Sequence, residues 1–225
     1  MGADLRLVIF DVDGTLVDSQ GDILAAMKVA FDAVDVPVPD RQVVLGVVGL
    51  SLDVIFPRLC PALSGAAHTT MVSAYKQAYM DLRAKAGVAQ SSPLYDGALA
   101  TLEALQSQPE VILGVATGKS RRGLDKLIDG HGLQGYFFTQ QVADYHPSKP
   151  HPSMILQAMR DVGVEPDRTI MVGDTSFDME MAAAAGVAGV GVSWGYHPKA
   201  ALGDAWTVVD SFAQVQPVLD EIWGV

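Results

Sequence analysis

The sequence contains an acidic cluster whose residue types and spacing could hold a metal ion. Asp11 and Asp13 are followed directly by Gly14 and Thr15. Gly14 supplies the backbone freedom for a turn that brings both carboxylates toward one pocket. Two neighbouring carboxylates repel each other when both are ionised, so the pair implies a cation or a shared proton. Oxygen ligands of this kind suit Mg²⁺, although a solvated turn that caps a helix is the alternative for this motif.

A second acidic cluster lies at residues 173–178 and contains Asp174 and Asp178. Asp174 could complete a metal site with the first cluster, and Asp178 could join it or anchor the loop by accepting backbone hydrogen bonds. Alone, this motif is more typical of a helix cap, in which Asp174 or Thr175 accepts a hydrogen bond from the start of the next helix. The two clusters together favour the metal site.

Two further segments carry groups that can bind phosphate. Thr117, Gly118 and Lys119 combine a hydroxyl, free backbone N–H groups and an ammonium at a predicted helix start, where phosphate oxygens can bind. Lys149, in a loop before Pro150, is a compact charge that can neutralise a phosphate and a nearby carboxylate. Each segment is weak evidence alone, because Thr-Gly caps and surface lysines are common. With the carboxylates, they provide the groups that phosphoryl transfer requires.

Two other kinds of metal site are excluded. An EF-hand loop needs glycine at its sixth position and glutamate at its twelfth, but counting from Asp11 these positions hold Leu16 and Asp22. Cys60 is the only cysteine, so a thiolate zinc site and an internal disulfide are both ruled out. We expect Cys60 to be a small buried apolar residue.

Composition limits the classes of partner. The chain has 225 residues, of which 49% are hydrophobic, and a formal net charge of -11. No basic stripe that could bind nucleic acid is visible, and the negative charge argues against docking on an anionic membrane surface. Residues 1–6 lack the features of a signal peptide. We therefore expect a cytoplasmic enzyme, monomeric or homodimeric, that acts on a small molecule.

The polar clusters need a scaffold that brings them together, and the apolar runs predict one. Strands are expected at residues 5–10, 111–116, 169–172 and 187–192, with weaker candidates at 136–139 and 206–209. Helices are expected at residues 97–107, 120–129, 153–162, 177–185 and 212–222. Continuous apolar strands separated by amphipathic helices predict an α/β fold with a Rossmann-like, doubly wound parallel sheet.

One stretch breaks the alternation of strands and helices. It contains amphipathic helical segments at residues 21–34, 41–47, 52–59 and 66–86, and no convincing strand. We therefore predict an inserted all-helical domain at residues 17–92, with residues 89–93 as the return linker. The α/β core is then formed by residues 1–16 and 93–225.

The predicted topology gives the polar clusters a common location. Each of them follows an apolar run or lies in a loop. In open parallel sheets, ligands bind beyond the carboxyl ends of the strands. We therefore expect Asp11, Thr117, Lys149 and Asp174 to converge on one site, although they are far apart in the sequence.

The four motifs, taken together, resemble the haloacid dehalogenase-like superfamily. They are Asp11-Val12-Asp13-Gly14-Thr15, Thr117-Gly118-Lys119, Ser148-Lys149-Pro150 and the cluster at residues 173–178, and they occur in the expected order across nearly the whole chain. The chain looks most similar to the phosphoglycolate phosphatase-like branch, which has a small helical cap between the first and second motifs.

The resemblance implies a magnesium-dependent phosphatase with an aspartyl-phosphate intermediate. Asp11 would be the nucleophile. Asp13 would protonate the leaving alkoxide and then activate water. Thr117 and Lys149 would orient and neutralise the phosphoryl group, and with them Gly118 and Lys119 would bind the substrate.

The resemblance also implies the ligands of the metal. Mg²⁺ would be held by the Asp11 side chain, the backbone carbonyl of Asp13, and Asp174, with Asp178 supporting the site. The helical insertion would be the cap that closes over the site and selects a small phosphorylated metabolite, excluding water during transfer and admitting it afterwards.

Other activities remain as alternatives. Dehalogenase and phosphonatase relatives lack a carboxylate at the position of Asp13, so its presence disfavours both. Sugar-phosphate mutases of the β-phosphoglucomutase type keep it, and they are the closest enzymatic rival. A non-catalytic phosphate-binding regulatory protein is the third hypothesis, but such a protein would be expected to have lost the nucleophile or a metal ligand.

The predicted cap points to the region that sets specificity. Residues 47–52 lie where the phosphoglycolate phosphatase-like branch has its specificity loop. Many of those relatives place a basic residue just before the loop, whereas this chain has Leu45 and Gly46 there, which weakens the case for glycolate phosphate. Arg58 or Lys119 could instead receive a substrate carboxylate, and His151 could line the entrance; each could equally be a surface residue.

Overall fold

The computed structural model describes residues 5–225, so the first four residues of the predicted core lie outside it. Within this range one sheet is formed, with all paired strands parallel, in the order β3-β2-β1-β4-β5-β6. Its strands are β1 (Arg6–Phe10), β2 (Val111–Thr117), β3 (Thr139–Val142), β4 (Thr169–Gly173), β5 (Ala188–Val192) and β6 (Thr207–Val209). The order runs outward from β1 in one direction and from β4 in the other, which confirms the predicted doubly wound α/β fold.

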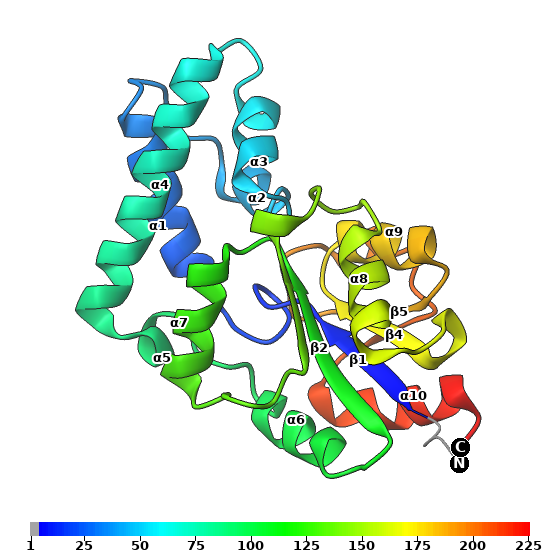
Figure 1. Ribbon diagram of the computed structural model, residues 1–225. Coiled ribbons are helices and arrows are strands. Elements are labelled where there is room, and N and C mark those ends of the chain that lie inside the picture. Colours follow the sequence, from blue (N-terminus) through cyan, green and yellow to red (C-terminus); the bar gives the residue numbers. More distant parts are fainter. Residues whose placement is uncertain (1–4) are drawn as a thin grey trace.

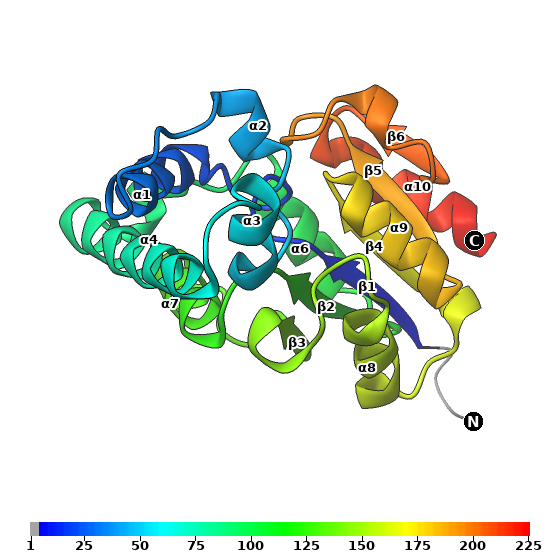
Figure 2. The same ribbon diagram turned by 90° about the horizontal axis from the view of Figure 1, so that it is seen from above.

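Helices cover both faces of the sheet (Figure 2). They are α6 (Ala98–Gln106), α7 (Arg121–His131), α8 (Ser153–Val162), α9 (Ser176–Ala185) and α10 (Val215–Trp223). Short 3₁₀ turns occur at Ala143–Tyr145, Pro166–Arg168, Lys199–Ala201 and Phe212–Gln214. Successive side chains of a strand point to opposite faces. Accordingly Leu7 and Ile9 of β1 pack with α8 and α9, whereas Val8 and Phe10 pack in the cluster that includes α6, α7 and α10.

Most of the segment between β1 and β2, up to residue 91, forms a separate helical group beside the sheet (Figure 1). It contains α1 (Gln20–Asp32), α2 (Arg41–Leu45), α3 (Leu52–Leu59), α4 (Gly65–Ala86) and α5 (Val88–Ser91). These helices have their own apolar cluster, against which the half-buried Cys60 packs. We propose that this group is a cap domain with the predicted limits of residues 17–92.

The cap cluster also contains side chains from the core. Phe177 at the start of α9 is buried in it, and Tyr196 from the loop after β5 packs against it. The ring of Phe177 lies under the guanidinium of Arg58 in α3, 5.5 Å from the ring centroid. The cap is therefore held against the core by apolar contacts on the side of β4 and β5.

Two segments differ from the sequence-based prediction. The weak strand expected at residues 136–139 is wrong, since β3 begins at Thr139, and Phe138 before it is largely exposed. The strand itself is polar apart from its last residue and so lacks the apolar signal. Residues 89–93, expected to be a linker, contain the end of the short helix α5. This helix packs closely on α7 at Gly130. Only glycine fits there, since a Cβ at this position would lie 2.6 Å from the Cβ of Val88.

The cap cluster should contribute measurably to stability. Phe56 is fully buried at its centre, with ring centroids 6.4 Å from Phe31 and 6.3 Å from Tyr75. We expect Phe56→Ala to lower the free energy of unfolding by about 3–5 kcal/mol, because it leaves a cavity. Urea denaturation measures the change. In the control Phe138→Ala, a ring that is 68% exposed is removed, and the loss should be below about 0.5 kcal/mol. Equal losses would contradict this account of the cap.

Among the helices of residues 5–225, none combines the length and apolar character needed to span a bilayer.

Candidate active site

The site lies where the carboxyl ends of the central strands meet. Asp11 directly follows β1, Thr117 ends β2, and Asp174 directly follows β4. Since β1 is paired with both β2 and β4, these residues are brought to one edge of the sheet. The topology therefore converts distant sequence positions into neighbours, as expected at such a switch point.

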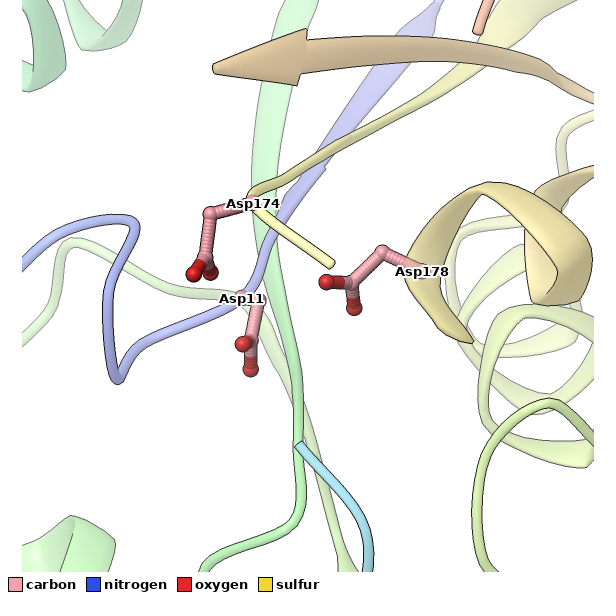
Figure 3. Close-up of side chains that lie close together, drawn as sticks. All are labelled: Asp11, Asp174 and Asp178. Atoms are coloured by element: carbon pink, nitrogen blue, oxygen red, sulfur yellow. The ribbon is translucent and has the colours of Figure 1, made fainter. Parts of the chain in front are cut away.

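Three carboxylates gather at this edge (Figure 3). One oxygen from each of Asp11, Asp174 and Asp178 lies within 4.8 Å of the others, and all three side chains are buried. Lys149, which is only 2% exposed, lies 2.8 Å from Asp11 Oδ1 and 2.6 Å from Asp178 Oδ1 through its Nζ. Three carboxylates and one ammonium leave two negative charges, which is the charge that a divalent cation would neutralise.

The residues present fit a hard divalent cation. Both carboxylate oxygens of Asp11 are buried; Oδ1 is paired with Lys149, whereas Oδ2 has no hydrogen-bond partner among the described residues, so its lone pairs are available. The carboxylate of Asp174 has room only because glycines surround it: a Cβ on Gly14 would lie 2.2 Å from its Oδ2, and one on Gly195 would lie 2.1 Å from its Cβ. Buried, closely spaced oxygen donors of this kind match the preferences of Mg²⁺.

Asp178 is held more tightly than the other two carboxylates. It lies in the first turn of α9 and forms a capping box with Thr175, the residue before the helix. Asp178 Oδ2 accepts hydrogen bonds from the Thr175 backbone N–H (3.0 Å) and hydroxyl (2.7 Å). Its other oxygen accepts from Lys149. The sequence leaves two roles open for Asp178, as a metal ligand or as an anchor of the loop. These contacts fit the anchor, which would hold Lys149 in place beside Asp11 and Asp174.

Asp13 lies beside the trio but its side chain belongs to a different set of contacts. Its Oδ2 is 2.8 Å from Lys119 Nζ, and its Oδ1 accepts a hydrogen bond from the Ser19 hydroxyl. The carboxylate is therefore fixed between a cation and a hydroxyl rather than directed into the acidic trio. This arrangement leaves the backbone carbonyl of Asp13 as the atom for its predicted role as a metal ligand.

The segment predicted to bind phosphate lies under the cap. Thr117 is buried, and its hydroxyl accepts a hydrogen bond from the Lys119 backbone N–H at 3.3 Å. Gly118 lies against the cap loop, since a Cβ there would come within 2.7 Å of the Gly49 carbonyl oxygen. Lys119 Nζ also donates to the hydroxyl of Tyr79 in α4, at 3.0 Å. Lys119 thus joins the cap to Asp13.

Several residues that hold the site in place are given no role by the sequence analysis. The Thr15 hydroxyl donates to Asp174 Oδ1 at 2.8 Å, and the Tyr196 backbone N–H donates to Asp174 Oδ2 at 2.8 Å. Tyr196 also contacts Ser19 through its hydroxyl, at 3.1 Å. Ser148 accepts a hydrogen bond from the Ser51 backbone N–H of the cap at 2.9 Å. Of these, Thr15 and Ser148 lie within recognised motifs, whereas Tyr196 and Ser19 are identified only by the fold.

A cavity of about 850 Å³ opens from Asp11 and Asp13 between the cap and the core. Thr117, Gly118 and Lys119 form part of its core side. The described residues that line it do not include Arg58 or His151, two candidate substrate contacts from the sequence. For Arg58 the reason is its position over the Phe177 ring.

Burial dominates the electrostatics of the acidic trio. It raises the pKa of Asp11 to about 7, against the lowering effect of Lys149 and with added repulsion from Asp178. Burial, together with repulsion from Asp11 and Asp178, also raises the pKa of Asp174 well above its ordinary value. A bound divalent cation would lower both pKa values.

The two lysines and Asp13 respond mainly to their partners. Burial alone would lower the pKa of Lys149, but Asp11 and Asp178 outweigh it and raise that pKa. Burial alone would raise the pKa of Asp13, but the Lys119 ammonium and the Ser19 hydrogen bond lower it below its ordinary value. Both lysines are therefore charged, and Asp13 is ionised.

Comparison with known proteins gives consistent matches over nearly the whole chain. Residues 8–192 match the family described as haloacid dehalogenase-like hydrolase. The protein named "Probable phosphatase IndB" from Dickeya dadantii is 36% identical over 214 residues, covering 93% of this chain and 91% of that protein. A phosphoglycolate phosphatase from Pasteurella multocida is 29% identical over 225 residues, covering 96% and 98% of the two chains.

The fold is shared as well. The crystal structure of a predicted phosphoglycolate phosphatase from Haemophilus somnus superimposes with a TM-score of 0.81 at 26% identity, covering 97% of this chain and 99% of that one.

Proposed function

The chain belongs to the haloacid dehalogenase-like hydrolases and is a phosphoric monoester hydrolase, and from this premise we propose that it cleaves a small phosphorylated metabolite by way of a phosphate on Asp11, with Mg²⁺ as cofactor. The substrate would be of the phosphoglycolate type or a similar phosphomonoester. One observation carries the proposal. Asp11 is buried beside Lys149 and Asp174, and while its Oδ1 is paired with Lys149, its Oδ2 has no hydrogen-bond partner among the described residues, so this oxygen is free to attack phosphorus.

In the first half of the reaction, a carboxylate oxygen of Asp11 attacks phosphorus and the bond to the ester oxygen breaks. Asp13, which takes up a proton when the substrate binds, gives that proton to the departing alkoxide. The negative phosphoryl group, on approaching Asp13, raises the pKa of that carboxyl and so favours the protonated form. Lys149 and the Thr117 hydroxyl neutralise and orient the phosphoryl oxygens.

In the second half, Asp13 takes a proton from water, which attacks phosphorus and releases inorganic phosphate from Asp11. The ion pair with Lys119 keeps Asp13 ionised, as this step requires. Asp11, the Asp13 carbonyl and Asp174 would hold Mg²⁺, supported by Asp178, and the cation would stabilise the charge on the transferring group.

The cap determines when water reaches the site. Its loop lies over Gly118, and Ser51 is hydrogen-bonded to Ser148, so the closed arrangement covers the phosphoryl pocket. Closure would exclude water during transfer to Asp11, and opening would admit it afterwards.

Rapid-quench labelling tests the proposal. Enzyme mixed with a labelled phosphate ester in the presence of Mg²⁺ should carry label that survives acid and is released by hydroxylamine, as an acyl phosphate is. Label in the Asp11→Asn variant, or steady hydrolysis without divalent metal, would overturn the proposal. Incubation with a hexose 1-phosphate separates hydrolysis from the alternative mutase, which would give hexose 6-phosphate rather than free phosphate. Binding without turnover of any ester would favour the non-catalytic alternative.

Lys119 should matter most for esters whose leaving group needs a proton. It fixes the Asp13 carboxylate from 2.8 Å, so Lys119→Met should misplace the general acid. We expect kcat/KM for an alkyl phosphate to fall by about 10–100-fold, with a much smaller change for p-nitrophenyl phosphate. The matched control is Lys126→Met, because Lys126 is an exposed lysine lining the same cavity. A uniform loss on both substrates would contradict the assigned role.

A further inference from the structure

The positive charges nearest the phosphoryl pocket already have carboxylate partners. Lys149 lies between Asp11 and Asp178, at 2.8 and 2.6 Å. Lys119 lies 2.8 Å from Asp13. Both lysine side chains are buried and held in place by these carboxylates, so Lys149 is positioned for the phosphoryl group and Lys119 for Asp13.

Arg83, a buried cation that also lines the cavity, likewise has partners. Arg83 of α4 is buried, with its Nε 3.6 Å from Asp22 Oδ2 and its NH2 group donating to the Ser92 hydroxyl at 2.9 Å. Its guanidinium lies over the Tyr79 ring, 4.5 Å from the centroid. The other cations that line the cavity are exposed: Lys76, Arg122 and Lys126. Three exposed carboxylates, Asp53, Asp81 and Asp144, line it as well.

The cap side of the cavity is largely apolar. The lining side chains of this kind come from α1, the 48–52 loop, α3 and α4: Ile23, Met27, Val48, Leu50, Leu52, Ile55 and Val72. Its volume of about 850 Å³ is in the upper part of the range of small-molecule sites, roughly 300–1,000 Å³. The space is therefore larger than a two-carbon alcohol needs.

We infer that the substrate is a phosphate monoester whose alcohol, in the part next to the phosphoryl group, is uncharged and apolar and has more than two carbons. This inference rests on the proposed function and narrows it. A carboxylate beside the phosphate, as in phosphoglycolate, would be buried against Asp13 and an apolar wall, where the buried cations among the described lining residues and Lys149 already have carboxylate partners. Burial of a charge without a partner of its own is strongly unfavourable.

Isosteric substrates test the inference. Phosphoglycolate is compared with 2-phosphooxyacetamide, which has the same shape without the charge, and with isobutyl phosphate, in which two methyl groups replace the carboxylate oxygens. We expect kcat/KM to be at least about tenfold higher for isobutyl phosphate than for phosphoglycolate. The value for the acetamide, which removes the charge but stays polar and has two carbons, should lie between them. A ratio near one, or in favour of phosphoglycolate, overturns the inference. The proposed function stands in either case, because it depends on Asp11 and Mg²⁺ rather than on this ratio.

A new cation on the apolar wall should reverse the preference. Leu52 lines the cavity and is half-buried, so Leu52→Lys should be tolerated; Leu52→Met is the uncharged control. We expect Leu52→Lys to shift the ratio toward phosphoglycolate by about tenfold relative to Leu52→Met. Val72→Lys, at another half-buried lining position on α4, is the second variant. No shift in either lysine variant would count against the inference.

Discussion

Replacing Asp11 with asparagine is expected to lower kcat by about 10⁴-fold or more, the scale on which enzymes respond to loss of their nucleophile. The amide keeps the shape of the side chain but cannot form the acyl phosphate. Because Lys149 retains Asp178 as a partner at 2.6 Å, the pocket should stay assembled. Release of p-nitrophenolate from p-nitrophenyl phosphate, with Mg²⁺ present, measures the loss.

The control is Asp18→Asn, which makes the same change at a nearby carboxylate that is hydrogen-bonded to Gln20. It should retain nearly full activity.

Thermal stability shows whether Asp11→Asn is inactive because it lacks the nucleophile or because it is misfolded. The pKa of Asp11 is raised from 3.8 to about 7 in the folded chain, so this carboxyl opposes folding increasingly as the pH rises between these values, in full when the pH is above 7, and not when the pH is below 3.8. In chelator, Asp11→Asn should therefore melt above the wild type at alkaline pH, and an inactive variant that melts far below it would be misfolded instead.

The parts of the fold that could be predicted are those with local signals. Residues 5–10 and 169–172 are largely apolar runs, followed by Asp11 and by Gly173 and Asp174, and each forms a central strand. An apolar run bounded by polar residues needs no knowledge of the tertiary structure to be recognised. Because both aspartates follow parallel strands, their meeting at one sheet edge could also be predicted.

The parts that could not be predicted depend on contacts between distant segments. β3 is polar because it is an edge strand beside β2, with its side chains held by hydrogen bonds such as that from Thr139 to Asp161. The ion pair between Lys119 and Asp13 depends on how the loops after β2 and β1 pack. The contact of Lys119 with Tyr79 depends on how the cap is placed over the core. No spacing rule links these positions.

The same limit explains why a basic residue in a cap sequence was a poor guide to specificity. Arg58 lies on the predicted third cap helix, but its guanidinium covers Phe177 at the join between cap and core. Arg83 was not singled out, yet it lines the cavity. Whether a cation is available to a substrate depends on its partners, and these are defined only in three dimensions.

Removal of divalent metal is expected to lower kcat by about 10³-fold or more, because the cation supplies charge stabilisation that the residues cannot replace. When all three carboxyls are ionised, the trio with Lys149 carries two uncompensated negative charges, which would repel a phosphate dianion. Activity of the EDTA-treated enzyme should return on addition of Mg²⁺. The cation should also stabilise the folded chain, by about 2–3 kcal/mol when its concentration is a hundred times the Kd.

A variant of Asp174 tests whether the effects of Mg²⁺ on activity and on stability arise from this site. Its carboxylate accepts hydrogen bonds from Thr15 and Tyr196, and an amide can keep the bond from Tyr196. Asp174→Asn should therefore remain folded but need at least about tenfold more Mg²⁺ for half-maximal activity, the scale on which metal affinity responds to lost ligation. It should also lose most of the rise in Tm that Mg²⁺ gives. The exposed Asp167→Asn is the control and should behave like the wild type. If Asp174→Asn responded to Mg²⁺ as the wild type does, the cation would have to bind elsewhere, and the charge balance around Asp11 would need another explanation.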